Sequence, residues 1–322
     1  MNILICLDHN YVMPYGIMLF SLCANNRDVD IHLYVITDQS FNQEDKKTLE
    51  DIVVTYNKNN SIDVYYVTDD MIHEMIAFEN KCYPRQTFYR LLMSNILPPS
   101  IDKILYLDGD IIIRKSLKDL WNIDLEGKAI GAVPDALSGI LEYYNRLHYS
   151  STLGYENAGV LLVNLKYWRE NNLEKQFVEF MKSHKSWIVL NDQDVLNYVT
   201  KEIKVHIPLK YNVQTMFLYK RKYMNFSIYQ YEDELDEAQT DPAILHFAGC
   251  GPWKENCPHP YKEEFFKYKA QTIWKDVPLS KVHVSIKDKM KEFLRKVLTP
   301  FGICHFVADY FDRDLKLISH NN

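Results

Sequence analysis

The sequence predicts an α/β fold, built as a single domain around a mixed, mostly parallel sheet. Short apolar runs alternate with segments of helical pattern from the N-terminus onward. A continuous apolar run is typical of a strand that is buried on both faces. Alternation of such strands with helices is typical of βαβ units, whose sheets are largely parallel. With 322 residues, the chain is long enough for one large domain of this class or two smaller ones.

Apolar runs and helical patterns locate the expected elements. The expected strands are 2–7, 31–36, 62–67, 103–107 with a continuation to 113, 131–133, 157–165 and 243–247. The expected helices are 13–23, 42–56, 86–97, 166–185 and one that begins at 191. Asn191 or Asp192 is the expected N-cap of the last helix, because both side chains accept hydrogen bonds from free backbone N–H groups. We expect 143–155 and 217–241 to be irregular, because neither shows a clear period.

Two carboxylates, Asp108 and Asp110, interrupt the apolar run 103–113. Unpaired buried carboxylates are costly, so these acids need a cation or hydrogen-bond donors close by. Gly109 lets the backbone turn between them, and both acids then face one point, as a divalent cation with oxygen ligands requires. The alternative is a polar Asp-Gly turn between two strands. Asp8 also follows a strand, and in open parallel sheets ligands bind beyond the carboxyl ends of the strands.

Composition and cysteine usage restrict the function classes. The formal net charge is −6, so bulk charge does not favour nucleic-acid binding. The six cysteines include no CxxC pair, and we interpret them as reduced thiols of a cytosolic protein. Cys250, Cys257 and His259 surround a loop rich in Gly and Pro, which leaves a soft-metal site as a weaker alternative.

The sequence favours a cytoplasmic protein that is peripheral on the inner face of the cell membrane. Residues 1–7 lack a basic segment and are too short for a secretory signal. No apolar stretch reaches the roughly 18 residues that a bilayer span needs. We divide the chain into a catalytic domain, 1–277, and a basic amphipathic tail, 278–322.

The tail carries the membrane prediction. Between 281 and 296 basic residues outnumber acidic ones. The apolar residues near helical spacing are Ile286, Met290, Phe293, Leu294, Val297 and Leu298. A basic amphipathic helix of this kind binds in a membrane interface. The alternative is a helix that packs on its own domain.

Several motifs, taken in order along the chain, resemble glycosyltransferase family 8. They are LDHNY at 7–11, TFYRL at 87–91, KILYLDGD at 103–110, NAGVLLVNL at 157–165, NDQDVLN at 191–197 and HFAG at 246–249. A DxD motif alone is unspecific, whereas these blocks keep the order and spacing of the family over about residues 1–261. The family includes bacterial lipopolysaccharide and lipooligosaccharide glucosyl- and galactosyltransferases, and glycogenin. The resemblance implies a GT-A fold, which is a nucleotide-sugar-binding, Rossmann-like domain.

The resemblance also implies roles for residues at matching positions. Asp8 and Asn10 would hydrogen-bond the uracil of a UDP-sugar, and Tyr11 would stack near it. The implied metal ligands, for Mn²⁺ or less well Mg²⁺, are Asp108, Asp110 and His246. The residues implied around the diphosphate and the donor sugar are Arg90, Gly109, Asp135, Asn157, Ala158, Asp192, Gln193 and Gly249.

One position departs from the family pattern. The family commonly has a lysine just before Pro-Trp, aimed at the diphosphate. Gly251 stands there in this chain, and Lys254 follows Pro252 and Trp253. Lys254 is the candidate that replaces the missing charge.

The implied reaction is retaining hexose transfer from UDP-galactose or UDP-glucose to an oligosaccharide or glycolipid acceptor. A divalent cation stabilises the negative charge on the departing UDP. Nearby carboxylates and amide oxygens stabilise an oxocarbenium-like sugar. Gln193 is the candidate nearest the anomeric carbon, and Asp192 and Asp194 are the alternatives.

Each candidate also has a purely structural interpretation. Asp8 suits a strand-end cap, Arg90 suits an ion pair, and a buried, hydrogen-bonded histidine is more common than a ligand at the position of His246. Asp192 and Asp194 are also typical of a helix N-terminus.

Two further functions compete with hexose transfer. A sugar nucleotidyltransferase usually has a Gly-rich, basic phosphate loop after its first strand, and 7–11 has neither Gly nor Lys. A catalytically silent nucleotide-sugar-binding protein is the other alternative, against which the intact acidic pair and His246 argue.

Overall fold

The fold is centred on a mixed seven-stranded sheet with the order β3-β2-β1-β4-β7-β6-β8. This computed structural model describes residues 1–76, 85–219, 231–249 and 251–281, together with Met290, 293–294 and 297–298. The strands of this sheet are β1 (Asn2–Cys6), β2 (His32–Thr37), β3 (Ser61–Tyr66), β4 (Lys103–Leu107), β6 (Ile130–Pro134), β7 (Glu156–Asn164) and β8 (Lys204–His206). From β3 to β4 neighbouring strands are parallel, whereas β7 is antiparallel to both β4 and β6. The predicted mixed, mostly parallel sheet is therefore confirmed.

A second, three-stranded sheet extends the fold at the end of β4. It has the order β5-β10-β9 and consists of β5 (Ile111–Ile113), β9 (Val213–Gln214) and β10 (Ile244–His246). The apolar run breaks around Gly109, as the sequence allows, and its two halves belong to different sheets, which was not predicted. The pair Asp108 and Asp110 lies at the passage from one sheet to the other.

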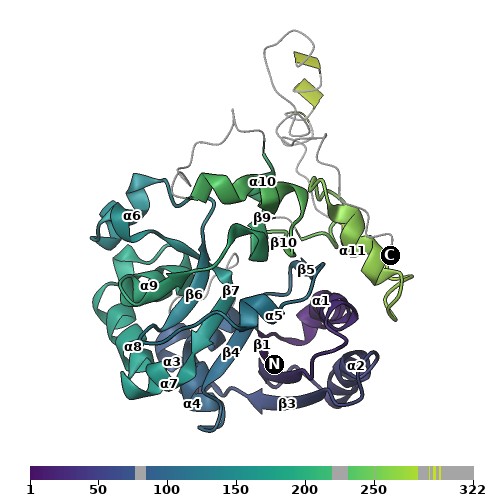
Figure 1. The fold of residues 1–322 in the computed structure, drawn as a ribbon, viewed down its shortest axis with the longest axis horizontal. Coiled ribbons are helices and arrows are strands. Elements are labelled where there is room, and N and C mark those ends of the chain that lie inside the picture. Colours follow the sequence, from purple (N-terminus) through teal and green to yellow (C-terminus); the bar gives the residue numbers. More distant parts are fainter. Residues whose placement is uncertain are drawn as a thin grey trace.

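Helices cover the main sheet on both faces (Figure 1). In chain order the α-helices are α1 (Val12–Asn25), α2 (Gln43–Val53), α3 (Asp69–Ile76), α4 (Met93–Ile96), α5 (Lys118–Trp121), α6 (Leu141–Leu147), α7 (Leu165–Glu170), α8 (Leu173–Ser183), α9 (Asn191–Thr200), α10 (Glu232–Thr240) and α11 (Lys262–Lys269). Short 3₁₀ segments are η1 (His9–Tyr11), η2 (Arg85–Leu92), η3 (Ser151–Leu153), η4 (Lys185–Trp187), η5 (Leu209–Tyr211) and η6 (Thr215–Leu218).

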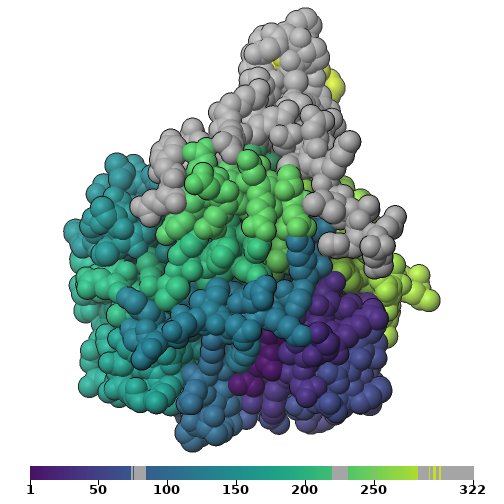
Figure 2. All heavy atoms as spheres, in the orientation of Figure 1, coloured from purple at the N-terminus to yellow at the C-terminus, as the bar shows by residue number. Residues whose placement is uncertain are grey.

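The alternating side chains of β1 enter two different hydrophobic cores. Ile3 and Ile5 pack with residues of α1, α2, α11 and the second sheet. Leu4 and Cys6 pack on the opposite face with residues of η2, α4, α7, α8 and α9. Burial on both faces explains why the strand reads as a continuous apolar run. In the space-filling view, the yellow-green atoms of α11 lie against the purple N-terminal part of the chain, where Asn25 Nδ2 donates to Tyr268 Oη at 2.8 Å (Figure 2).

Some predicted helices have different forms in the structure. The segment 86–97 is the 3₁₀ segment η2 followed by the short helix α4, and not one α-helix. The segment 166–185 is divided into α7 and α8, because Asn172 has the left-handed backbone value φ 51° that a continuous helix excludes.

Two irregular segments and one helix cap were predicted wrongly, and two short strands were not predicted. Residues 143–147 belong to α6 and 232–240 form α10, although 143–155 and 217–241 were expected to be irregular; 220–230 lie outside the described residues. Neither Asn191 nor Asp192 caps α9, since both are already inside it and Leu190 is the N-cap. Strands β8 and β9, which are three and two residues long, carry too few residues for a readable pattern.

The structure describes little of the tail. Of the residues beyond 281, Met290, 293–294 and 297–298 are described, so the predicted helix lies largely outside the described residues, as does Cys250. The first tail residues remain attached to the body: Ser280 N donates to Trp253 O at 2.8 Å, and Glu255 N donates to Ser280 O at 3.2 Å. No helix in the described part of the chain is long and apolar enough to cross a membrane.

Candidate functional site

The acidic pair and the histidine are brought together by the pairing of β5 with β10. Asp110 directly precedes β5, and His246 ends β10, where it pairs with Ile111. The backbone fixes this register, because Phe247 N donates to Asp110 O at 2.8 Å. Asp108 is tied to β7 in the same way, since its N–H donates to Gly159 O at 2.9 Å. Residues far apart in sequence thus meet at one point.

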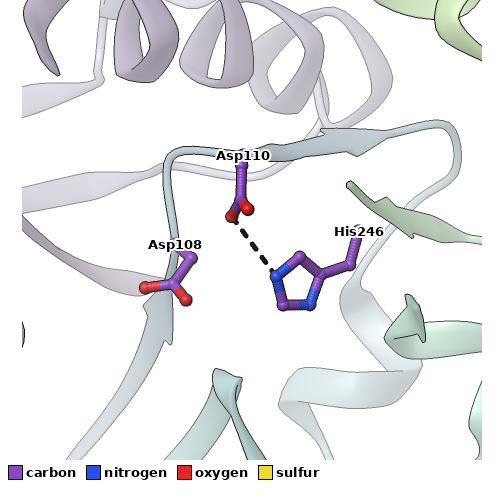
Figure 3. A group of neighbouring side chains, drawn as sticks. All are labelled: Asp108, Asp110 and His246. Atoms are coloured by element: carbon purple, nitrogen blue, oxygen red, sulfur yellow. Dashed lines mark ion pairs between the residues drawn. The ribbon is translucent and has the colours of Figure 1, made fainter. Parts of the chain in front are cut away.

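Asp108, Asp110 and His246 form a candidate metal site. Each offers one ligand atom, and these atoms all lie within 4.8 Å of one another. Asp110 points towards His246, with Asp110 Oδ1 3.3 Å from His246 Nε2, and Asp108 lies beside them (Figure 3). Two carboxylates and one imidazole suit Mn²⁺, and Mg²⁺ less well. The described residues therefore fit the cation that the sequence predicts.

The two sides of this cluster influence each other's protonation. Burial alone would lower the pKa of His246, but the charges of Asp110 and Asp108 outweigh it and raise that pKa. Burial would raise the pKa of Asp110, but the neighbouring imidazolium and its hydrogen bond lower it. The imidazolium therefore supplies positive charge next to the two carboxylates.

Arg90 supports the cluster from the opposite side. Its Nη2 lies 3.0 Å from Asp108 Oδ1, and its Nη1 donates to Ala158 O at 2.7 Å. Its guanidinium stacks 4.3 Å above the ring of Tyr106, whose hydroxyl donates to the same Asp108 oxygen at 2.5 Å. Arg90 is buried, so it holds Asp108 in one orientation.

Arg90 also forms an ion pair with a second acid, Asp192. Its Nε lies 3.2 Å from Asp192 Oδ2. Burial raises the pKa of Asp192 to about 6, with a contribution from the charge of Asp108, although Arg90 opposes the shift. A carboxyl that titrates near neutral pH is suited to an active site.

A group of amides and one acid forms the neighbouring part of the site. Asn157 Nδ2 donates to Asp135 Oδ2 at 3.1 Å and to Gln193 Oε1 at 3.3 Å. Gln193 Nε2 donates to the same Asp135 oxygen at 3.1 Å, and Gln193 Oε1 also accepts from Ala158 N at 3.0 Å. The two amides therefore have fixed orientations, and the Gln193 oxygen already accepts two hydrogen bonds.

Two adjoining cavities contain these residues. The first has a volume of about 480 Å³, and its lining includes Asp8, Tyr11, Trp253 and Lys254. The second, of about 400 Å³, is lined by Asp135, Asn157, Ala158, Asp192, Gln193 and His246. Arg90, Asp108, Asp110 and Gly249 line both cavities, and Gly109 lines the first. The candidate metal site thus lies where the two cavities meet.

Asn10 and Asp194 are the candidates that line neither cavity. Asn10 Nδ2 instead donates to Asp8 Oδ2 at 3.4 Å, and Asp8 Oδ1 accepts from Tyr11 N at 3.2 Å as the cap of η1. Asp194 is fully buried and binds both Arg146 and the hydroxyl of Tyr155, at 2.7 Å in each case. It also accepts from the backbone N–H groups of the two residues before α9, so it has a structural role.

Several residues of the site were not predicted from the sequence. Asn212 Oδ1 lies 2.8 Å from His246 Nδ1, and the ring of Trp253 meets that of Tyr11 edge to face with centroids 6.0 Å apart. Gly159 is required beside the metal site, because a Cβ atom there would lie 2.4 Å from His246 Cε1. The match of 157–165 to a family motif was a signal for Gly159, whereas no motif contains Asn212.

Comparisons with known proteins agree with this geometry. The family model "Glycosyl transferase family 8" matches residues 2–257. General stress protein A of Bacillus subtilis is 28% identical over 282 residues, 86% of this chain and 96% of that protein. Lipopolysaccharide 1,3-galactosyltransferase of Salmonella typhimurium is 25% identical over 324 residues, 98% of this chain and 91% of that protein.

A solved structure shares the fold. The galactosyltransferase LgtC, crystallised in complex with donor and acceptor sugar analogs, superimposes with a TM-score of 0.74 at 23% identity. The match covers 90% of this chain and 100% of that one.

Proposed function

Because the chain belongs to glycosyltransferase family 8 and is therefore a hexosyltransferase, we propose that it is a metal-dependent, retaining enzyme. It transfers galactose or glucose from a UDP-sugar to a glycan or lipid-linked acceptor. The observation that carries this proposal is the convergence of Asp108, Asp110 and His246 at the junction of two cavities.

The two cavities suggest how a UDP-sugar is placed. The first cavity takes the nucleotide, with Asp8 and Tyr11 at the uracil end and Lys254 towards the diphosphate. The second takes the hexose, because it presents a carboxylate and two amides, which are suited to sugar hydroxyl groups. The diphosphate then lies at the junction, next to the acidic pair.

The side chains at the junction stabilise the departing UDP. Asp108, Asp110 and His246 would hold Mn²⁺, which supplies positive charge where negative charge develops on the leaving diphosphate. Lys254 adds a second positive charge to the wall of the nucleotide cavity. Arg90 keeps Asp108 oriented and is itself neutralised by Asp108 and Asp192.

The arrangement of Gln193 supports a retaining reaction without a strong base. Its oxygen accepts from Ala158 N and from Asn157, so it provides a fixed dipole at the wall of the hexose cavity. A fixed dipole stabilises an oxocarbenium-like sugar without reorganisation. Asp192 and Asp135 are the nearby carboxylates that add negative charge on this side.

The tail completes the proposal. Met290, Phe293, Leu294 and Val297 are exposed, which favours a membrane surface over packing against the domain. We place the enzyme at the inner face of the cell membrane, where lipid-linked acceptors are found.

The decisive experiment is a screen of UDP-sugars with Mn²⁺, scored by UDP release in water and then with acceptor sugars. We expect release with UDP-galactose or UDP-glucose that depends on Mn²⁺. Asp110→Asn should reduce it at least about a hundredfold, because one metal ligand becomes neutral. The matched control, Asp276→Asn, changes an exposed acid beyond both cavities and should keep full activity.

The same screen separates the competing functions. Full activity of the Asp110→Asn variant would refute the metal site. Formation of UDP-sugar from UTP and a sugar phosphate would indicate a nucleotidyltransferase. Binding of a UDP-sugar without any release of UDP would indicate a silent binding protein.

A further inference from the structure

We propose that Asn212 is a positioning residue that fixes the tautomer of His246 and links the metal site to the hexose cavity. The inference rests on the metal site of the proposed function. Asn212 is fully buried and follows η5, whose residues make no direct contribution to either cavity. Its amide contacts His246 on one side and Asn157 on the other.

A backbone N–H group sets the direction of the hydrogen bonds. Asn157 Oδ1 accepts from Gly159 N at 3.0 Å, and a backbone N–H acts only as a donor. The atom of Asn157 that faces Asn212 is therefore an oxygen. The atom of Asn212 that lies 2.9 Å from it must be the donor Nδ2.

The orientation of Asn212 then determines the histidine. With Nδ2 turned to Asn157, its Oδ1 faces His246 Nδ1 at 2.8 Å. An amide oxygen only accepts, so the hydrogen must be on Nδ1 of the imidazole. In the neutral ring the lone pair is then on Nε2, which faces Asp110 and the metal site.

The hydrogen bonds continue from Asn212 through Asn157 to the hexose cavity. With its oxygen turned to Gly159 and Asn212, Asn157 directs Nδ2 to Asp135 and Gln193. The metal ligand and the cavity wall are thus parts of one hydrogen-bonded unit. Partners that orient a metal-binding histidine typically change metal affinity 10- to 100-fold when they are removed.

Two substitutions separate the two contacts of Asn212. Asn212→Leu has a similar size and removes both hydrogen bonds. In Asn212→Asp the carboxylate still accepts a hydrogen bond from His246 Nδ1. Its other oxygen faces the oxygen of Asn157, so the hydrogen bond that leads to the hexose cavity is broken. Asn60→Leu is the control, because Asn60 is also a buried amide but bonds Ile31 N and Val53 O, outside both cavities.

The first measurement is Mn²⁺ affinity in the presence of UDP, from the electron paramagnetic resonance signal of free Mn²⁺. We expect at least tenfold weaker binding in Asn212→Leu, and binding within about threefold of wild type in Asn212→Asp and Asn60→Leu. For Asn212→Asp we expect the KM for the UDP-sugar to rise more than kcat falls. Thermal melting of each variant reports whether it folds.

The second measurement does not depend on metal or activity. Long-range ¹H–¹⁵N spectra of the metal-free protein at alkaline pH, with His246 assigned from a His246→Gln variant, should show the Nδ1–H tautomer in wild type and Asn212→Asp. In Asn212→Leu, His246 should no longer prefer the Nδ1–H tautomer.

Some outcomes would overturn the proposal. The proposal is refuted if a folded Asn212→Leu variant keeps the Mn²⁺ affinity and the His246 tautomer of wild type. It is also refuted if Asn212→Asp and Asn212→Leu lose Mn²⁺ affinity equally. If Asp110→Asn also binds Mn²⁺ like wild type, the metal site itself is refuted. If Asp110→Asn loses Mn²⁺ affinity but Asn212→Leu binds Mn²⁺ like wild type, the proposed function stands and the role of Asn212 is refuted.

Discussion

Arg90 and Asp192 form a buried ion pair, with Arg90 Nε 3.2 Å from Asp192 Oδ2. Arg90 also binds Asp108, so one guanidinium lies between two carboxylates of the site. Arginine suits this position because its planar fork serves two acids and stays charged when buried. The pair connects η2 to the N-terminus of α9; both residues line the second cavity, and Arg90 also lines the first.

Arg90→Met should destabilise the protein, because it leaves Asp108 and Asp192 without their buried partner. We expect a loss of about 3–5 kcal/mol in the free energy of unfolding, measured in urea. Arg27→Met is the control, since Arg27 is exposed, and should cost less than about 1 kcal/mol. Equal stability of the two variants would contradict the role of Arg90.

Gly159→Ala should disrupt the metal site without unfolding the sheet. The added Cβ would lie 2.4 Å from His246 Cε1 and 3.0 Å from Asp108 Oδ2, so both ligands must move. We expect Mn²⁺ affinity in the presence of UDP to fall at least about tenfold. In the control, Gly131→Ala on β6, the new Cβ meets the end of the Ile207 side chain at 3.1 Å, and Mn²⁺ affinity should not change.

His259 should make the protein less stable as the pH falls. The side chain is buried, its Nδ1 accepts from Tyr261 N at 3.1 Å, and burial together with the charge of His246 lowers its pKa to about 3. An unfolded histidine titrates near about 6.5, so below that pH the unfolded state binds one proton more. The stabilisation is complete above about pH 6.5 and is lost as the pH falls towards about 3.

A variant isolates this effect from the other histidines. Between pH 8 and pH 5, His259 should account for about 2 kcal/mol of lost unfolding free energy. His259→Asn keeps an acceptor for Tyr261 N, and its stability should fall less over this range. Identical pH profiles in urea unfolding would show that His259 is not the titrating group.

Truncation of the tail should release the protein from membranes. The cut belongs after Lys281, because a cut after Pro278 would also remove the hydrogen bonds of Ser280 to Trp253 and Glu255. The intact chain should float with anionic lipid vesicles at moderate salt, and the truncated chain should stay in solution, since basic residues near such surfaces contribute about 1 kcal/mol each. UDP release in water should be retained. Unchanged flotation after truncation would refute membrane binding by the tail.

Much of the fold was readable because its signals are local. The run 103–113 indicated a buried strand that can break at Gly109, and β4 and β5 occupy its two halves. The N-terminal βαβ units were equally clear, because β1 and β2 are buried on both faces. Predictions failed where tertiary contacts outweigh local patterns, as in η2, a 3₁₀ segment from which the buried Arg90 contacts two acids.

Which chemical groups are present, and where they interrupt the strands, follows from the amino-acid order alone: the pair Asp108 and Asp110, His246 at a strand end, and the motif with Gln193. Their orientations arise only when the two sheets and the helices pack together. The direction of the Asn212 amide depends on a backbone N–H of β7, and the burial of Arg90 depends on α9. Hydrogen-bond direction and desolvation are set by atoms that meet across sheets, and no periodicity along the chain records them.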